Sequence, residues 1–332
     1  MCLEGLIRDY GDIDAEVAAC RNDVALFDFS FMARGAAAGP LARQSVQALI
    51  SRPLEALRPG RIVYCVRTDG RGHALADLTV WQTNPDRYEV FSGRGEDIAA
   101  IAGGDDLTEE SCVLSVQGPG SLRALVGLAD LDALSQLAYF AHAEIEIGGI
   151  RCRVGRLGYT GERGFEIVAP AGAKQRLWDI LCAKARPAGF AAADILRIEA
   201  GFMLFSNEFR PMVTPAEAGL QRFDAARAAP RRVELVGFRA DCRFRPILYA
   251  PDGSLPFPPR EDEIAITSAA WSASLGCVIG LGYVRADAAR EEFVDPAGKF
   301  QKVRKADLPF IDPAKRRVRG GWRSSDLLPD YL

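Results

Sequence analysis

One segment of the sequence, RIVYCVRTDGRGHALADLTVWQT at residues 61–83, constrains the fold more than any other. Two β-rich runs flank the pair Asp69-Gly70, and an Asp-Gly pair between such runs is a strong hairpin signal. The pattern therefore predicts two antiparallel strands in a sheet. A single carboxyl group, Asp77, falls inside the second run. A lone acid there must find a hydrogen-bond partner or reach solvent, and the spacing leaves both outcomes open.

A second isolated acid, Glu166, lies in the segment GRLGYTGERGFEIVAP at residues 155–170. Its glycines indicate a tight turn, and the apolar run that follows predicts a strand. Strand alternation places Phe165 and Ile167 on one face and Glu166 on the other. Spacing alone leaves Glu166 either on the solvent face of a half-buried strand or in a functional site.

The rest of the chain alternates between short helices and strands without a strict βαβ rhythm, which is typical of an α+β fold. Helical spacing is found at residues 13–23, 41–50, 95–103, 171–185 and 192–204. After Phe223 the composition changes to an Ala/Arg-rich linker, followed by strand-like runs separated by Pro-rich turns. Residues 35–109 therefore form one predicted α+β unit, and residues from about 228 form a predicted all-β unit.

Charge and hydropathy together disfavour two classes of partner, nucleic acids and membranes. The formal net charge is −3, from 41 basic and 44 acidic residues, whereas dedicated nucleic-acid binders carry a basic excess on at least one domain. Positive charge is concentrated only near the end of the chain, at Lys315, Arg316, Arg317, Arg319 and Arg323. No apolar stretch approaches the length of a membrane span. We therefore expect neither a nucleic-acid nor a membrane partner.

The eight cysteines form no C-x-x-C pair, so a zinc ribbon or a thioredoxin-type centre is unsupported. Several lie inside apolar runs, as Cys65 does, and buried reduced thiols are typical of a reducing compartment. The N-terminal residues contain no apolar core of a secretory signal. The sequence therefore predicts a cytoplasmic protein.

The repertoire of catalytic side chains is narrow. His73 and His142 are the only two histidines, which leaves too few ligands for a His-rich metal site or a His-based triad. The chain has no G-x-S-x-G elbow, no P-loop and no G-x-G-x-x-G after a strand. Catalysis must therefore rest on carboxylates, tyrosines and a bound cofactor, and we expect no metal.

Several motifs in one order resemble the aminomethyltransferase (T-protein) of the glycine cleavage system and its folate-dependent relatives. The resemblance covers nearly the whole chain. Its motifs are VALFDFSFMARG (24–35), Tyr64 with ADL (76–78), VQGPGS (116–121), GRLGYTGERGFEI (155–167), LRIEAG (196–201), PAEAGL (215–220) and ITSAAWSASLGCVIGLGYV (266–284).

This resemblance implies a three-domain, cloverleaf T-protein-like fold. Residues 1–34 and 110–227 would form a discontinuous folate-binding domain. Residues 35–109 would form a ferredoxin-like insertion domain, and residues 228–332 a C-terminal antiparallel β-barrel domain.

The resemblance also implies transfer of an aminomethyl or methyl unit from a small one-carbon donor to tetrahydrofolate or another tetrahydropterin. A carrier protein or a partner subunit is a further expected partner. Glu166 would grip the pterin edge, whose parallel N–H donors suit a carboxylate. Tyr64, Tyr159 and Arg197 would bind the same cofactor. Asp77 would be catalytic, orienting the attacking amine and stabilising the positive charge that develops.

Three departures concern the same expected site. Ala76 replaces the first of two acids that precede a leucine, and Ala193 and Asp312 stand where the family has arginines that would hold the acidic tail of folate. We hypothesise that the pterin site is kept and that tail recognition is retuned, towards another pterin or through the basic residues 315–317.

The alternative function is a non-catalytic folate-binding protein of the iron–sulfur cluster assembly or regulatory type. Cluster-assembly proteins of this kind carry the motif K-G-C-Y-x-G-Q-E. The corresponding region here, NEFRPMVTPAEAGLQRF at residues 207–223, has no cysteine, which disfavours that type. A regulatory paralogue without ligand is a further possibility. A flavin-linked oxidase would need a separate flavin subunit, because the chain has no dinucleotide fingerprint.

Overall fold

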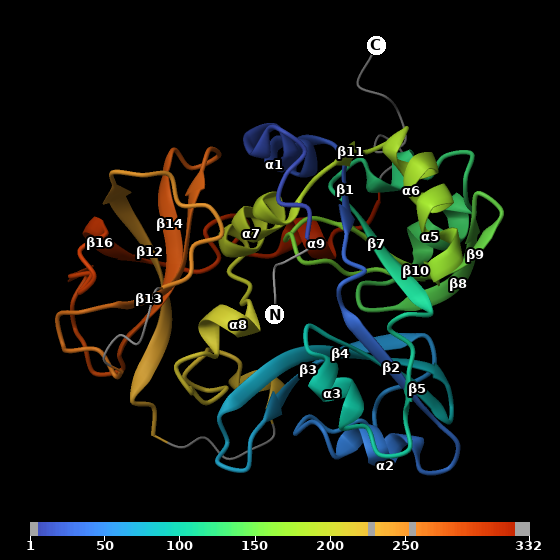
Figure 1. Cartoon of the computed structure of the whole chain (residues 1–332), viewed down its shortest axis with the longest axis horizontal. Helices are drawn as coiled ribbons and strands as arrows, with labels where there is room; N and C mark the ends of the chain where they lie inside the picture. The colour runs from blue at the N-terminus through green and yellow to red at the C-terminus, as the bar shows by residue number, and fades with distance from the viewer. Residues whose placement is uncertain (1–5, 225–229, 252–256, 323–332) are drawn as a thin grey trace.

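A computed structural model describes residues 6–224, 230–251 and 257–322. Figure 1 shows three sheet-containing lobes around a centre occupied by helices α7 (Phe190–Glu199) and α8 (Phe205–Glu208). Each lobe is built on one of three sheets. The mixture of helices and sheets confirms the predicted α+β class.

The strands of the first sheet come from two parts of the chain, one before and one after residues 35–109. Its strand order is β11-β1-β7-β10-β9-β8. The strands are β1 (Ala25–Asp28), β7 (Ser111–Gln117), β8 (His142–Ile147), β9 (Ile150–Gly155), β10 (Gly164–Pro170) and β11 (Arg186–Pro187). Gly148 and Gly149 join β8 to β9 with φ of 58° and 76°, the backbone that a two-residue type I′ hairpin turn requires.

Both faces of the first sheet are covered. Helices α1 (Ile13–Asn22), α4 (Ser121–Ala124), α5 (Leu131–Gln136) and α6 (Lys174–Cys182) belong to this unit. On one face, Phe165 and Ile167 of β10 join a core with Leu177 of α6. On the other, Val168 joins a core with the α7 residue Leu196. Strand β10 therefore has no solvent face, and the predicted alternation directs Glu166 into the interior.

The second sheet has the order β3-β4-β5-β2-β6. Its elements are β2 (Ala33–Ala38), α2 (Ala42–Gln47), β3 (Arg61–Thr68), β4 (Ala74–Asn84), β5 (Arg87–Ser92), α3 (Gly95–Ala99) and β6 (Asp105–Asp106). Without β3, the chain order β2-α2-β4-β5-α3-β6 is the ferredoxin-like β-α-β-β-α-β arrangement. Strand β3 is an added edge strand.

The predicted hairpin at residues 61–83 is confirmed, because β3 and β4 pair in antiparallel register. Its turn differs from the expected Asp69-Gly70 pair. The connection runs from Asp69 to His73, and Gly72 rather than Gly70 has a positive φ, of 84°. The Asp69 carboxylate accepts hydrogen bonds from the backbone N–H groups of Arg71 and His73, each at 2.8 Å. This Asx-type bonding stabilises the longer turn.

The third sheet is antiparallel, with the order β13-β14-β12-β16-β15. Its strands are β12 (Val233–Cys242), β13 (Ala265–Ser272), β14 (Cys277–Arg285), β15 (Glu292–Phe293) and β16 (Phe300–Ala306). Ala270 and Ile279 of this sheet share a core with α7 and with Trp81 of the second sheet. That shared core joins the three units.

After β16 the chain returns to the first unit and forms the helical turn α9 (Arg316–Arg319). Among residues 230–251 and 257–322, this turn is the one departure from the expected all-β character of the chain beyond 228. We propose the domain boundaries 1–34 with 110–227, 35–109 and 228–332, because each range supplies one sheet; β2 begins at Ala33, just before the second range.

The seven cysteines in the described part of the chain are all free thiols, and Cys2 lies outside it. Within the same residues, every helix is too short or too polar to cross a bilayer.

Candidate functional site

A cavity of about 890 Å³ lies between the first and second units. Its walls come from the β1–β2 connection, β3, β4, β10, the segment 201–205, the 3₁₀ turn at Gln221–Phe223 and the α9 segment. Among the predicted site residues, Tyr64, Asp77, Tyr159 and Glu166 all line it. The structure thus brings together side chains that are up to 102 positions apart in the sequence.

Asp77 and Tyr64 lie on adjacent strands and form a direct pair. The Tyr64 hydroxyl donates a hydrogen bond of 3.1 Å to Oδ2 of Asp77. Burial raises the pKa of Asp77 to about 6, and the Tyr64 hydrogen bond acts in the opposite direction. Burial and the nearby Asp77 carboxyl raise the pKa of Tyr64 well above its usual value. Asp77 can therefore exchange a proton near neutral pH, while Tyr64 stays a hydrogen-bond donor.

Glu166 is the second carboxyl group of the cavity, and the residue is 8% exposed. Among the described residues, none donates a hydrogen bond to its carboxylate. Burial alone raises its pKa to about 7. Buried polar groups in proteins are nearly always hydrogen-bonded. The Glu166 carboxylate is therefore available to a ligand that brings donors.

Tyr159 contributes its ring rather than its hydroxyl. The hydroxyl donates a 2.5 Å hydrogen bond to the backbone carbonyl of Met203, and the ring stacks on Phe202 at a centroid distance of 6.2 Å. The preceding Gly158 leaves room for Gln117, since a Cβ there would come within 2.0 Å of Oε1 of Gln117. The chain thus passes close to Gln117 and places the Tyr159 ring in the cavity wall.

Arg197 does not line the cavity. It is fully buried and donates to Asp194 at 2.9 Å, to Glu208 at 2.9 Å and to Ser268 at 2.6 Å. It also donates to the carbonyl of Phe202 at 3.1 Å. This placement makes Arg197 a residue that holds the 201–205 segment, and its predicted direct contact with a cofactor has no support from the geometry.

The lining also contains basic residues, most of which the sequence did not single out. Among the described residues, the basic members of the lining are Arg52, Arg61, Arg222, Lys315 and Arg319. Only Lys315 belonged to the hypothesised tail site at residues 315–317, and the other two members of that site are absent from the lining. No local pattern predicts that Lys315 and Arg319 would both face the cavity, because Lys315 is the left-handed N-cap residue of α9 and Arg319 is its last residue.

Ala193 and Asp312, which stand where the family has arginines, have other roles in this chain. Ala193 is fully buried in the core around α7. Asp312 accepts a 2.7 Å hydrogen bond from the backbone N–H of Arg317 and one of 2.8 Å from that of Lys315 through its carbonyl. Asp312 therefore stabilises the turn that carries Lys315 and Arg319. Arg323 lies outside the described residues.

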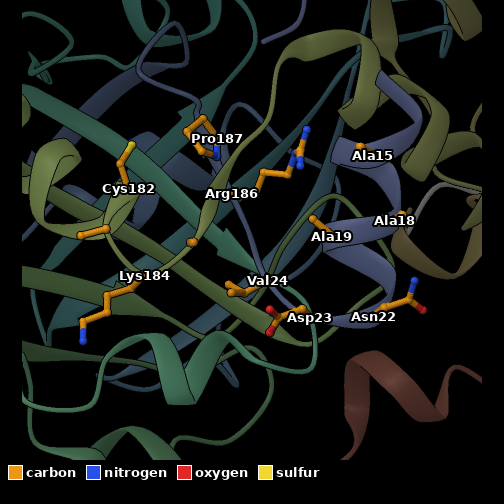
Figure 2. A pocket seen from close by; sticks show the side chains of 12 residues that line it. Ala15, Ala18, Ala19, Asn22, Asp23, Val24, Cys182, Lys184, Arg186 and Pro187 are labelled. Carbon is orange, nitrogen blue, oxygen red and sulfur yellow. The ribbon is translucent and has the colours of Figure 1, made fainter. Parts of the chain in front are cut away.

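A second hollow, of about 580 Å³, lies between α1 and the segment that follows α6. Figure 2 shows its wall of small side chains, including Ala15, Ala18 and Ala19, together with Val24 and Pro187. None of the predicted site residues lines it. The described residues also contain no group of three or more His, Cys, Asp or Glu side chains that could hold a metal ion. We therefore place the functional site in the central cavity.

Comparisons with known proteins agree with this architecture. Residues 9–226 match the family model "GCVT N-terminal domain", and residues 235–312 match "Glycine cleavage T-protein C-terminal barrel domain". An aminomethyltransferase of Desulforamulus reducens is 31% identical over 337 residues, covering 93% of this chain and 92% of the relative. One of Geobacillus kaustophilus is 32% identical, covering 92% of each chain.

A solved structure shows the same fold. The aminomethyltransferase T of the glycine cleavage system from Bartonella henselae superposes with a TM-score of 0.75 at 22% identity, covering 94% of this chain and 91% of that one. Two family models and full-length relatives therefore agree with the geometry: the chain belongs to the aminomethyltransferase family, the glycine cleavage T-proteins.

Proposed function

We propose that this chain is a transferase that moves a one-carbon unit from a small donor to tetrahydrofolate or another tetrahydropterin. One observation carries the proposal. Asp77 from the second sheet and Glu166 from the first face the same cavity, and burial has shifted the pKa of both towards neutrality. Convergent carboxyl groups with shifted pKa values in an apolar cavity are typical of a catalytic or binding site.

The residues of the cavity fit a tetrahydropterin. Its volume of about 890 Å³ lies within the range of roughly 300–1,000 Å³ usual for small-molecule sites. Aromatic rings of Phe29, Phe91 and Phe202 supply apolar walls for a planar heterocycle. Glu166 offers a buried acceptor without a donor among the described residues. A pterin edge with adjacent N–H groups would supply two donors to it.

Asp77 would act on the reacting centre. When bound, the tetrahydropterin supplies the nitrogen that receives the one-carbon unit. As the bond between the one-carbon unit and the donor breaks and a bond to this nitrogen forms, the ionised Asp77 carboxylate would accept the proton that the nitrogen loses, would stabilise positive charge beside it, and could pass the proton to the departing group of the donor. Tyr64 fixes this carboxylate with its 3.1 Å hydrogen bond. The burial that raises the pKa of Asp77 also strengthens the electrostatic effect of its charged form.

Glu166 would orient the cofactor so that its reactive end meets Asp77. Tyr159 supports this arrangement through its ring and through the hydroxyl bond that ties it to Met203. Arg197, by donating to the carbonyl of Phe202, keeps the facing segment in place. A carrier protein or a partner subunit could present the donor, which is a further part of the proposal.

The experiment that tests the proposal is titration of the purified protein with tetrahydrofolate and with tetrahydromethanopterin, followed by a turnover assay for aminomethyl and methyl donors. We expect micromolar binding of one pterin, a loss of binding in Glu166→Ala, and turnover with a small amine donor. If neither pterin binds, the proposal fails. Binding without turnover for any donor would support the non-catalytic alternative instead.

A further inference from the structure

Two buried acids lie behind the cavity wall without lining it, and each is paired with an arginine. Glu208 of α8 lies 2.9 Å from Arg197, and both side chains are fully buried. Asp97 of α3 is also fully buried and lies 2.6 Å from Arg67, whose side chain is 22% exposed. The cost of removing both charges from water offsets much of the attraction in such a pair. Stability alone is therefore a weak reason for these acids, and their other contacts indicate what they do.

Glu208 holds the wall segment that contains Leu204. Its Oε2 accepts a 2.6 Å hydrogen bond from the backbone N–H of Leu204, as well as the one from its arginine partner. Its Oε1 accepts hydrogen bonds from the hydroxyls of Thr267 at 2.8 Å and Ser268 at 2.5 Å, both on β13. Since these four groups all donate, the side chain accepts them all as a carboxylate. The charged Glu208 thereby ties the cavity wall to the third sheet.

The same wall segment meets the strands of the second sheet closely. Helix α8 packs against β4, the strand that carries Asp77 (Figure 1). The ring of Phe205 fits against Gly93, where a Cβ atom would lie only 2.3 Å from it. Phe205 and Gly93 both line the cavity. This close approach leaves the wall beside Asp77 little room to shift.

Asp97 holds a second wall group, the hydroxyl of Ser92. Ser92 lines the cavity and lies opposite Leu78, the residue after Asp77, in the register of β4 and β5. Its hydroxyl donates a 2.5 Å hydrogen bond to Oδ2 of Asp97. The Arg67 guanidinium donates to Oδ1 at 2.6 Å. Both groups donate, so Asp97 also accepts them as a carboxylate.

Both negative charges act on the carboxyl group of Asp77. Burial is the largest cause of its raised pKa, and the charges of Glu208 and Asp97 act in the same direction, against the hydrogen bond from Tyr64. Burial and the charge of Asp77 raise the pKa of Tyr159 well above its usual value, although the nearby arginine acts against them. The charged and titratable groups of the described structure that face Asp77 thus include the two acids with their arginine partners and the two tyrosines.

We propose that Glu208 and Asp97 are positioning residues for Asp77, which fix the wall at Leu204 and Ser92 and keep two negative charges in the surroundings of its carboxyl group. This inference rests on the proposed function, under which Asp77 accepts a proton and passes it on. A group that must both take and release a proton works best when its pKa lies near the working pH. The two acids bring Asp77 towards that condition without touching the ligand.

The test measures the titration of Asp77 in the ligand-free protein by NMR, with carbon-13 at the side-chain carboxyls of aspartate. Asp77→Asn identifies the signal. We expect Asp77 to titrate near pH 6 in the wild type and at lower pH in Glu208→Gln and in Asp97→Asn, because each variant removes a negative charge. The acid limb of the pH–rate profile should move to lower pH in the same variants, which a merely loosened wall would not cause.

Glu217→Gln is the matched control, because Glu217 is a buried acid that is paired with Arg232 at 2.9 Å and does not line the cavity. It removes the same charge and should leave the titration of Asp77 at the wild-type pH. Glu208→Asp keeps the charge next to Arg197 and should also titrate Asp77 near the wild-type pH. Asp97→Asn provides a folded variant even where Glu208→Gln does not fold, because water can reach the partly exposed Arg67.

The inference is overturned if Asp77 titrates at the wild-type pH in the folded variants of Glu208 and Asp97, or if Glu217→Gln shifts the titration equally. The NMR measurement needs neither a pterin nor turnover. A shifted titration in a protein that binds no pterin would therefore contradict the proposed function and leave the positioning of Asp77 supported.

Discussion

The Tyr64 hydroxyl and the Asp77 carboxylate meet diagonally across β3 and β4. Tyr64 lies opposite Thr79 in the register, and Asp77 lies two residues before Thr79 on the same face. Diagonal neighbours in an antiparallel pair are within reach of a long aromatic side chain, and the measured oxygen–oxygen distance is 3.1 Å. The hairpin register alone therefore sets the position of the proposed catalytic carboxylate.

Asp77→Asn should abolish turnover without weakening pterin binding. The amide keeps the size of the side chain and can still meet Tyr64, but it cannot accept a proton. General acid–base catalysis contributes about 10²–10⁴-fold, so kcat should fall by that amount. Measuring kcat together with the pterin Kd checks this. Unchanged turnover would remove Asp77 from the mechanism.

Tyr64→Phe should shift the acid limb of the pH–rate profile to higher pH. The Tyr64 hydrogen bond lowers the pKa of Asp77, which burial has raised to about 6. Removing the hydroxyl raises that pKa further, so the active carboxylate form is reached only at higher pH. Tyr88→Phe is the control, because Tyr88 is buried in the same unit but does not line the cavity. If the acid limb lies at the same pH in Tyr64→Phe as in the wild type, this hydrogen bond does not lower the pKa of Asp77.

Pterin binding should weaken as the pH falls below about 7. The pKa of Glu166 in the free protein is about 7, and its ionised form is the better acceptor for ligand N–H groups. Glu166→Gln should lower affinity by about 10- to 100-fold and remove this pH dependence. The measurement is the pterin Kd of the wild type and of Glu166→Gln at a series of pH values. Equal pH dependence in the two proteins would mean that Glu166 is not the titrating group.

The same Glu166→Gln variant should be more stable than the wild type at pH 8. Burial raises the folded-state pKa of Glu166 from 4.5 to about 7, so folding is penalised once the unfolded chain ionises. The penalty is absent below pH 4.5, grows between the two pKa values and is complete above pH 7. The gain at pH 8 should be on the order of 3 kcal/mol. Denaturant unfolding at pH 8 and at pH 4 gives the free energy of unfolding of the wild type and of Glu166→Gln. If the difference in free energy between the two proteins is the same at both pH values, this account is contradicted.

Arg197→Met should destabilise the fold and loosen the cavity wall. Arg197 is fully buried between Asp194 and Glu208, which are themselves 2% and 0% exposed. Removing one partner of a buried ion pair costs about 3–5 kcal/mol, measurable by denaturant unfolding. The control Arg285→Met removes an exposed arginine that pairs with Asp287 and should leave the unfolding midpoint nearly unchanged. Similar effects of both variants would argue against a structural role for Arg197.

Local features of the fold could be predicted because local rules determine them. The hairpin at residues 61–83 follows from turn chemistry and β-rich flanks, and the direction of Glu166 follows from strand alternation. The turn itself was wrong in detail, because the Asp69 side chain bonds two backbone N–H groups and stabilises a longer connection.

Features that depend on contacts between distant segments could not be predicted from local patterns. The face of β10 that carries Glu166 is covered by α7 and the second sheet, so spacing alone could not separate a buried acid from an exposed one. Every residue of α7 is buried, and its sequence pattern therefore could not tell which side of the helix Arg197 occupies. Arg222 and Arg319 line the same cavity only because the chain returns to it after the third sheet.

A structure of the protein with bound tetrahydrofolate tests the central claim most directly. The account predicts pterin N–H donors within about 3 Å of the Glu166 carboxylate, with the reactive nitrogens beside Asp77. A cofactor bound elsewhere, or a pterin ring in the cavity that leaves Glu166 without a donor, would contradict it.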